Sequence, residues 1–138
     1  MELPNSAPFH RLELPPGEAV LWHGFNPTFH RGVEYGAVLT DVALYWYKSP
    51  WSLGRWRRFP LVAIRSVEFE NSGLRPAMRL DMESKVVRLH TPHDFYGDEM
   101  DFDRKVLAKG VAEIRQRLGG ASSGDVSPNT SLERTREG

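Results

Sequence analysis

Apolar and polar residues alternate along most of the chain between residues 19 and 90. A period of two residues places successive side chains on opposite faces, which is typical of half-buried β-strands. Clusters of Gly, Pro, Asn and Asp separate the alternating stretches and favour turns. The pattern therefore predicts seven short strands, over residues 19–25, 34–40, 42–48, 55–61, 64–70, 77–83 and 85–90.

The same alternation assigns a face to each side chain. In the third strand, Leu44 and Trp46 are expected on one face. Tyr45 and Tyr47 are expected on the other, which we call the tyrosine face. The fifth strand is expected to carry three residues on its inner face, Arg65, Val67 and Phe69. The tyrosine face, together with Glu68 and Glu70, is either an exposed surface for a partner or a second copy of the chain, or a mixed surface in contact with solvent.

After residue 98 the hydrophobic period changes to three and four residues, which predicts an amphipathic helix. Gly110 lies on its apolar side and is expected to let the helix approach a sheet closely. Gly119 and Gly120 are expected to end the helix. The apolar stripe consists of Phe102, Val106, Leu107, Val111, Ile114 and Leu118.

The two ends of the chain have a different composition from its centre. Residues 1–13 are rich in proline and form an irregular lead-in, from which Phe9 and Leu12 are expected to dock on the body. Residues 119–138 are rich in Gly, Ser, Thr and Asn and contain too few large apolar residues to offset the entropy of ordering. We therefore expect one folded domain over residues 14–118 and a disordered tail after it.

Seven antiparallel strands followed by one helix predict a mainly β fold, in which a curved seven-stranded sheet forms a partly open barrel capped by the C-terminal helix. Three segments support a family comparison: PPGEAVLWHG at 15–24, GAVLTDVALYWY at 36–47 and LVAIRSVEF at 61–69. Their rhythm resembles that of bacterial PH-like and GRAM-like domains, members of the pleckstrin-homology-like superfold. The resemblance implies a module that binds or scaffolds lipids, peptides or other domains.

The chain departs from classical PH domains at the loop where these hold phosphoinositides. Basic residues flank that loop in the family, whereas residues 25–32 here offer Arg31 and His30, with His23 nearby. The helix also lacks the tryptophan of classical PH domains. The first difference argues against high-affinity phosphoinositide binding, and the second favours a distant, GRAM-like or bacterial relative.

Composition narrows the classes of function. The 138 residues carry a formal net charge of zero, which gives no global field toward nucleic acid or an anionic membrane. The chain contains no cysteine, so disulfides and thiolate metal sites are excluded. The start of the sequence lacks the pattern of a signal peptide, and no apolar run reaches the roughly 20 residues of a membrane helix. We expect a cytoplasmic protein that requires no cofactor.

The segment KSPWSLGRWRR, at residues 48–58, combines basic and aromatic residues around one turn. Trp51 in that turn can anchor on a partner or a membrane surface, and the basic side chains can hold an anionic ligand. Alternation places Arg55 and Arg57 on one face, and Trp56 and Arg58 on the other. The alternative is structural: Trp56 joins the core, Trp51 covers the sheet edge and the arginines keep that edge soluble. The predicted binding residues are Lys48, Trp51, Arg55, Arg57 and Arg58, with a protein or an anionic ligand as partner and nucleic acid disfavoured.

The segment HTPHDFYGDEMDFD, at residues 90–103, offers a second hypothesis. His90, His93 and Asp94 are of the types that bind zinc or iron in small metal-dependent enzymes. The favoured alternative is that His90 ends the last strand and that the carboxylates lie in the first helical turn, where the helix dipole stabilises them. We therefore expect no enzymatic activity and no bound metal.

Overall fold

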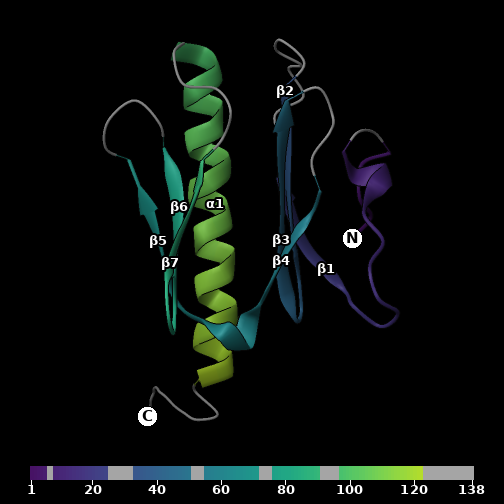
Figure 1. Ribbon diagram of the computed structural model, residues 1–138, viewed down its shortest axis with the longest axis vertical. Coiled ribbons are helices and arrows are strands. Elements are labelled where there is room, and N and C mark those ends of the chain that lie inside the picture. The colour runs from purple at the N-terminus through teal and green to yellow at the C-terminus, as the bar shows by residue number, and fades with distance from the viewer. Residues whose placement is uncertain (6–7, 25–32, 51–54, 72–75, 91–96, 123–138) are drawn as a thin grey trace.

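The computed structural model describes residues 1–5, 8–24, 33–50, 55–71, 76–90 and 97–122 (Figure 1). Within these ranges the chain forms seven strands, one long helix and two short 3-10 helices. The strands are β1 (Val20–Gly24), β2 (Val33–Thr40), β3 (Ala43–Pro50), β4 (Arg57–Pro60), β5 (Ile64–Glu70), β6 (Ala77–Met82) and β7 (Val86–His90). The helices are η1 (Phe9–Arg11), η2 (Leu61–Ala63) and α1 (Gly97–Ser122). The mainly β composition, the seven strands and the C-terminal helix are as the sequence predicts.

The strands form two antiparallel sheets that face each other, rather than one continuous curved sheet (Figure 1). Sheet A has the order β1-β2-β3-β4 and sheet B the order β5-β6-β7. The chain leaves sheet A at Pro60, which has no N–H to extend a ladder, and turns through η2 before β5 begins. The Leu61 amide instead donates a hydrogen bond to the Val42 carbonyl, at 2.9 Å. The prediction of one continuous curved sheet is therefore wrong at this point, because β4 and β5 belong to different sheets.

Alternation in β3 is confirmed, because Leu44 and Trp46 face the space between the sheets and Tyr45 lies in a separate cluster on the other side. In β5 the predicted face of Arg65 is wrong. The register shifts between Ile64 and Ser66, so two residues of β5 oppose one of β6. A bulge of this kind displaces the alternation by one position, which leaves Arg65 exposed.

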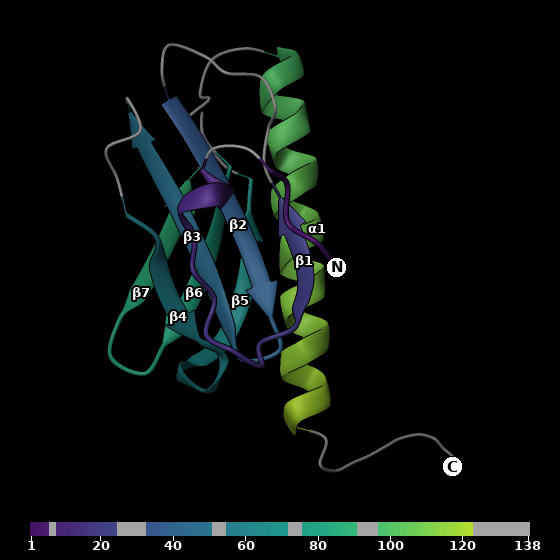
Figure 2. The same cartoon turned by 90° about the vertical axis from the view of Figure 1, so that its right-hand side faces the viewer.

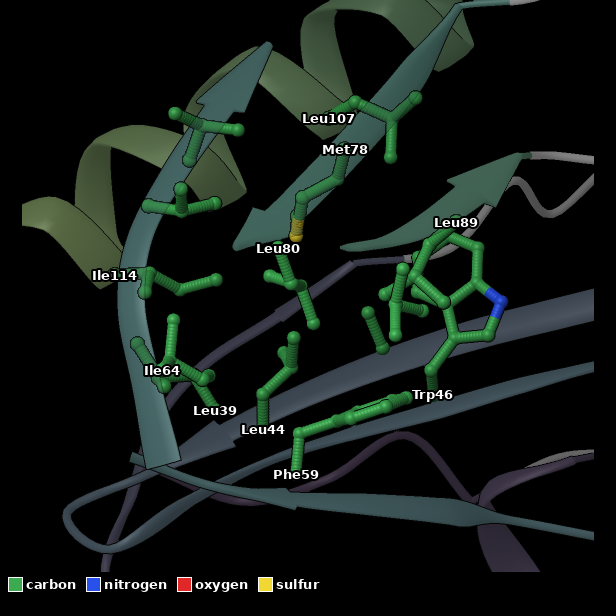
Figure 3. Close-up of a cluster of buried hydrophobic side chains, with 14 of the residues drawn as sticks. Leu39, Leu44, Trp46, Phe59, Ile64, Met78, Leu80, Leu89, Leu107 and Ile114 are labelled. Carbon is green, nitrogen blue, oxygen red and sulfur yellow. The ribbon is translucent and has the colours of Figure 1, made fainter. Parts of the chain in front are cut away.

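The main core fills the space between the two sheets and the helix (Figure 3). Side chains from three layers meet there, and most of them are removed from solvent. Sheet A contributes Leu39, Leu44, Trp46 and Phe59, sheet B contributes Met78, Leu80 and Leu89, and the helix contributes Leu107 and Ile114.

The helix α1 lies against β1, β5 and β6, and so closes the side of the sandwich at which β1 and β5 are edge strands. Its close approach to the sheets at Gly110 is confirmed. A Cβ at that position would lie 2.7 Å from Cη2 of Trp22 and 3.0 Å from Cε of Met78. The helix continues to Ser122, so the predicted stop at Gly119 is wrong. Gly119 keeps a right-handed helical backbone instead of the left-handed cap conformation.

The N-terminal segment packs on the outer face of sheet A, on the side away from the main core (Figures 1 and 2). Phe9 is 3% exposed and forms a second apolar cluster with Val38, Ala43 and Tyr45, against which Leu12 also packs. The expected docking of Phe9 and Leu12 is thus confirmed. Consequently Tyr45 and Tyr47 are buried, and the expectation that they share an exposed face with glutamates of β5 is wrong. The domain boundaries at residues 14 and 118 stay predictions.

The described part of the chain contains no helix that is both long enough and apolar enough to span a bilayer.

Candidate functional site

A pocket of about 380 Å³ opens on the outer face of sheet A, between β3, the start of β4 and the N-terminal segment. We call it the arginine pocket. Three guanidinium groups and three aromatic rings surround it, together with one aliphatic and one acidic side chain. The lining residues are Arg11, Leu12, Glu13, Tyr45, Tyr47, Arg55, Trp56 and Arg58.

Arg58 is held in place by two neighbours. Its Nε donates a hydrogen bond to the hydroxyl of Tyr45 at 3.1 Å, and its Nη2 lies 3.6 Å from a carboxylate oxygen of Glu18. The hydrogen bond to Tyr45 raises the pKa of Arg58 above its usual value, and the attraction of Glu18 adds to this effect. About half of the side chain is still open to solvent, so the fixed guanidinium can contact a ligand.

Glu18 lies behind the pocket and connects three strands. Its carboxylate accepts hydrogen bonds from the hydroxyls of Thr40, at 2.8 Å, and Tyr45, at 2.9 and 3.1 Å. The Glu18 side chain is 7% exposed. Burial raises the pKa of Tyr45, which therefore stays protonated and can donate to Glu18 while it accepts from Arg58.

Arg11 reaches the pocket from the N-terminal segment. Its Nη2 donates to the hydroxyl of Tyr47 at 2.8 Å, and its guanidinium carbon lies 5.1 Å from the centre of that ring. Sequence reasoning missed Arg11 as a site residue. The available signal was its position between Phe9 and Leu12, two residues that were expected to dock on the body.

The residues before β4 form the third side of the pocket. Trp56 is half-buried, and its Nε1 donates to the Pro8 carbonyl at 3.3 Å. Its ring centre is 5.4 Å from that of Tyr47 and 5.8 Å from that of Phe9. Trp56 therefore belongs to the outer cluster and not to the main core. Arg55 is exposed and makes no ion pair with the rest of the described chain.

The predicted shared face of Trp56 and Arg58 is confirmed, because both line the pocket. The predicted shared face of Arg55 and Arg57 is wrong, because Arg55 also lines the pocket and Arg57 does not. Strand β4 begins at Arg57, so strict alternation does not extend back to Arg55. Arg57 lies opposite Trp46 in the register, and its guanidinium is 4.9 Å from the centre of the Phe59 ring. Lys48 is exposed and does not line the pocket. Trp51 lies outside the described residues.

The arginine pocket combines features that suit a small anion. A guanidinium presents a planar set of donors that matches a carboxylate or phosphate. The volume of the pocket, about 380 Å³, falls within the range of roughly 300–1,000 Å³ that is typical of ligand sites. Glu13 at the rim and Glu18 behind offset part of the positive charge, so Arg55 is the guanidinium most available to a ligand.

The predicted metal residues are described only in part. His90 is the last residue of β7 and is half-buried, which agrees with the strand-end interpretation. His93 and Asp94 lie outside the described residues. Among the residues that are described, no three His, Asp or Glu side chains gather as metal ligands would. The metal hypothesis therefore stays a prediction.

Comparison with known proteins gives information on the fold. No family model matches the chain, and no curated protein matches it. Among solved structures, the hSac2 domain from the human phosphoinositide phosphatase Sac2 is similar, with a TM-score of 0.51 and 14% sequence identity. The match covers 86% of this chain and 77% of that one. At this identity the likeness concerns the arrangement of strands and helix, and it assigns no ligand to this chain.

Proposed function

We propose that this protein is a non-enzymatic binding module of the PH-like, GRAM-like type, which holds a phosphate-bearing ligand in the arginine pocket. The observation that carries the proposal is the convergence of Arg11, Arg55 and Arg58 on one pocket of about 380 Å³. The resemblance of residues 15–118 to PH-like and GRAM-like domains, carried by the segments 15–24, 36–47 and 61–69, supports the class. The structural likeness to the hSac2 domain concerns the arrangement of the fold alone.

The order already present in the pocket supports binding. Arg58 and Arg11 are each fixed by a tyrosine hydroxyl, at 3.1 and 2.8 Å, so little side-chain entropy is lost when a ligand arrives. Arg55 supplies a guanidinium that is not neutralised by a described carboxylate. An anion placed among these three groups gains charge-assisted hydrogen bonds, which are about twice as strong as neutral ones.

Phosphate esters are the ligand class that best fits this arrangement. Three guanidinium groups can surround a tetrahedral phosphate, whereas a carboxylate is satisfied by one or two. The ligand can be a soluble phosphate ester or the headgroup of a lipid, because both present the same oxygens. The carboxylates near the pocket and the zero net charge of the chain predict moderate rather than high affinity.

Isothermal titration calorimetry separates these sources of phosphate. Inorganic phosphate and an inositol trisphosphate are the soluble probes, and vesicles with and without a phosphoinositide are the membrane probes. Binding to a soluble probe shows that the phosphate group is sufficient, whereas binding to phosphoinositide vesicles alone shows that the lipid surface contributes. The name of the similar hSac2-containing phosphatase motivates the inositol probes.

Charge reversal tests the location of the site. Arg55→Glu should abolish binding, and Arg57→Glu, two residues away on a different surface, should leave it nearly unchanged. Arg65→Glu is the matched control on sheet B, because Arg65 is also exposed and has no ion pair within the described chain. If all three variants lost binding affinity equally, the loss would reflect the change in net charge alone, and the proposed pocket would be overturned. Absence of binding to every probe would overturn the proposed ligand class.

A further inference from the structure

A second cavity, of about 830 Å³, lies at the end of the sandwich where η2 and the turn between β2 and β3 approach the C-terminal third of α1. We call it the end groove. Its floor and walls are mainly aliphatic, with Leu21, Val42, Leu61, Val62 and Leu118 among the lining residues. It is separate from the arginine pocket, with which it shares no lining residue.

Two valines at the end groove are unusually open to solvent. Val62 is 98% exposed and Val42 is 43% exposed, although both are large apolar residues beside an apolar cavity. Val62 is the middle residue of η2, so its side chain projects from the rim. A single exposed valine is ordinary, but exposed valines that border an apolar groove are typical of an interaction surface.

The charges on the helical wall of the groove indicate what covers it. Glu113 and Arg117 both line the groove and are one helical turn apart. Glu113 pairs with Lys109 at 3.0 Å, whereas Arg117 makes no ion pair with the rest of the described chain. Asp41 also lines the groove, outside the helix, and its carboxylate accepts a hydrogen bond from the Ala19 amide at 3.0 Å. Along the helix itself, an acidic peptide would meet Glu113 and a basic peptide would meet Arg117.

A second copy of the same chain avoids this conflict. A two-fold axis perpendicular to α1 would set the two helices antiparallel and would place Glu113 of each copy opposite Arg117 of the other. The rim is therefore complementary to itself, as a closed two-fold interface requires. A pair of this kind would also bury Val62 and Val42, because both valines border the same groove.

We propose that this protein forms a two-fold dimer through the end groove, with Val62 as the apolar contact and Glu113 and Arg117 as reciprocal ion pairs. The dimer does not depend on the proposed phosphate site. Loss of phosphate binding in Arg55→Glu would leave it unaffected, so the two proposals can fail separately.

Sedimentation equilibrium of the full chain tests the proposal over a concentration range from about 1 µM to about 1 mM, which spans weak and moderate dimers. Wild-type protein should pass from monomer to dimer within this range. Val62→Asp should remain monomeric. Val86→Asp is the matched control, because Val86 is a half-exposed valine on β7 that does not line the groove, and it should dimerise like the wild type.

A charge-swap pair tests the geometry. Glu113→Arg should weaken the dimer by about tenfold or more, since each ion pair becomes a like-charge contact. The double variant Glu113→Arg/Arg117→Glu should restore the wild-type dissociation constant. Monomeric wild-type protein throughout the range would overturn the proposal, as would a dimer that Val62→Asp leaves intact. If the double variant dimerised as weakly as Glu113→Arg alone, the antiparallel arrangement would be overturned.

Discussion

Glu18 and Arg58 lie 3.6 Å apart and join the segment before β1 to strand β4, which are 40 positions apart in the sequence. The contact is built around Tyr45, whose hydroxyl bonds to both residues. The Glu18 side chain is almost fully buried, whereas about half of the Arg58 side chain is exposed. The buried carboxylate therefore fixes the position of a guanidinium that solvent can still reach. The arrangement orients a guanidinium toward the arginine pocket before any ligand arrives.

Replacing Glu18 with alanine should destabilise the protein by about 1–3 kcal/mol, because the hydroxyls of Tyr45 and Thr40 lose a buried acceptor. Chemical denaturation measures the change. Glu13→Ala is the matched control, since Glu13 is exposed at the rim of the same pocket, and it should change stability by less than about 0.5 kcal/mol. Equal effects of the two substitutions would contradict the supporting role of Glu18.

Adding one methyl group at Gly110 should destabilise the protein. The new Cβ would lie 2.7 Å from the Trp22 ring, and overpacking of this kind costs about 1–3 kcal/mol, more than the roughly 1 kcal/mol gained in helix propensity. Gly119→Ala is the control within the same helix, where nothing lies within 4 Å, and it should be neutral or stabilising. Thermal melts of both variants test this, and a stabilised Gly110→Ala would show that the helix does not sit this close to the sheet.

Removing the Phe9 side chain tests whether the N-terminal segment is part of the folded unit. Phe9 is 3% exposed beneath Tyr45 and Trp56, so Phe9→Ala should cost about 3–5 kcal/mol. Urea titration followed by tryptophan fluorescence gives the loss. Val86→Ala, at a side chain that is 50% exposed and does not line the end groove, should cost less than about 1 kcal/mol. A Phe9→Ala variant as stable as the wild type would mean that the segment is not bound to the sheet.

The sequence predicted those features of the fold that depend on local pattern. A buried face leaves a regular hydrophobic period in the sequence, of two residues in 77–83 and of three to four residues after residue 98. Strand β6 and helix α1 are therefore found where they were expected. The division into two sheets could not be read in this way. It depends on whether β5 pairs with β4 or only with β6 after the chain turns at Pro60. That choice is determined by packing across the whole fold and not by the local sequence.

The candidate site was predicted only in part, for related reasons. Arg55 and Arg58 were named, but alternation was extended to a residue that precedes β4, so their shared surface was missed. Arg11 joins them through a contact to Tyr47 that spans 36 positions. The displacement of Arg65 by a bulge is also a product of pairing with β6. Long-range contacts of this kind leave little trace in a hydrophobic pattern.

Acid should weaken the charged network on the outer face of sheet B. Hydrogen bonding from Arg88, assisted by Arg79, lowers the pKa of Glu70 below its ordinary value. A lowered carboxyl pKa adds stability above the ordinary pKa, and this stability is lost as pH falls through the folded-state pKa. Glu70→Gln should therefore be less stable than the wild type at about pH 7, and the difference should shrink as pH falls through the lowered folded-state pKa of Glu70.

Urea unfolding at several pH values measures this difference. Glu83→Gln is the control, because Glu83 is exposed and makes no ion pair with another described residue, and its stability should run parallel to that of the wild type. A constant difference between wild type and Glu70→Gln across the pH range would contradict the role given to the Arg88 hydrogen bond.

The proposed phosphate site is tested most directly by NMR titration with an inositol trisphosphate, followed through the side-chain N–H signals of Arg11, Arg55, Arg58 and Trp56. We predict that these signals shift together and saturate with a single dissociation constant, whereas the signal of Arg57 changes little. In Arg55→Glu the shifts of the remaining signals should disappear. Shifts that map to another surface, or that persist unchanged in Arg55→Glu, would contradict the account.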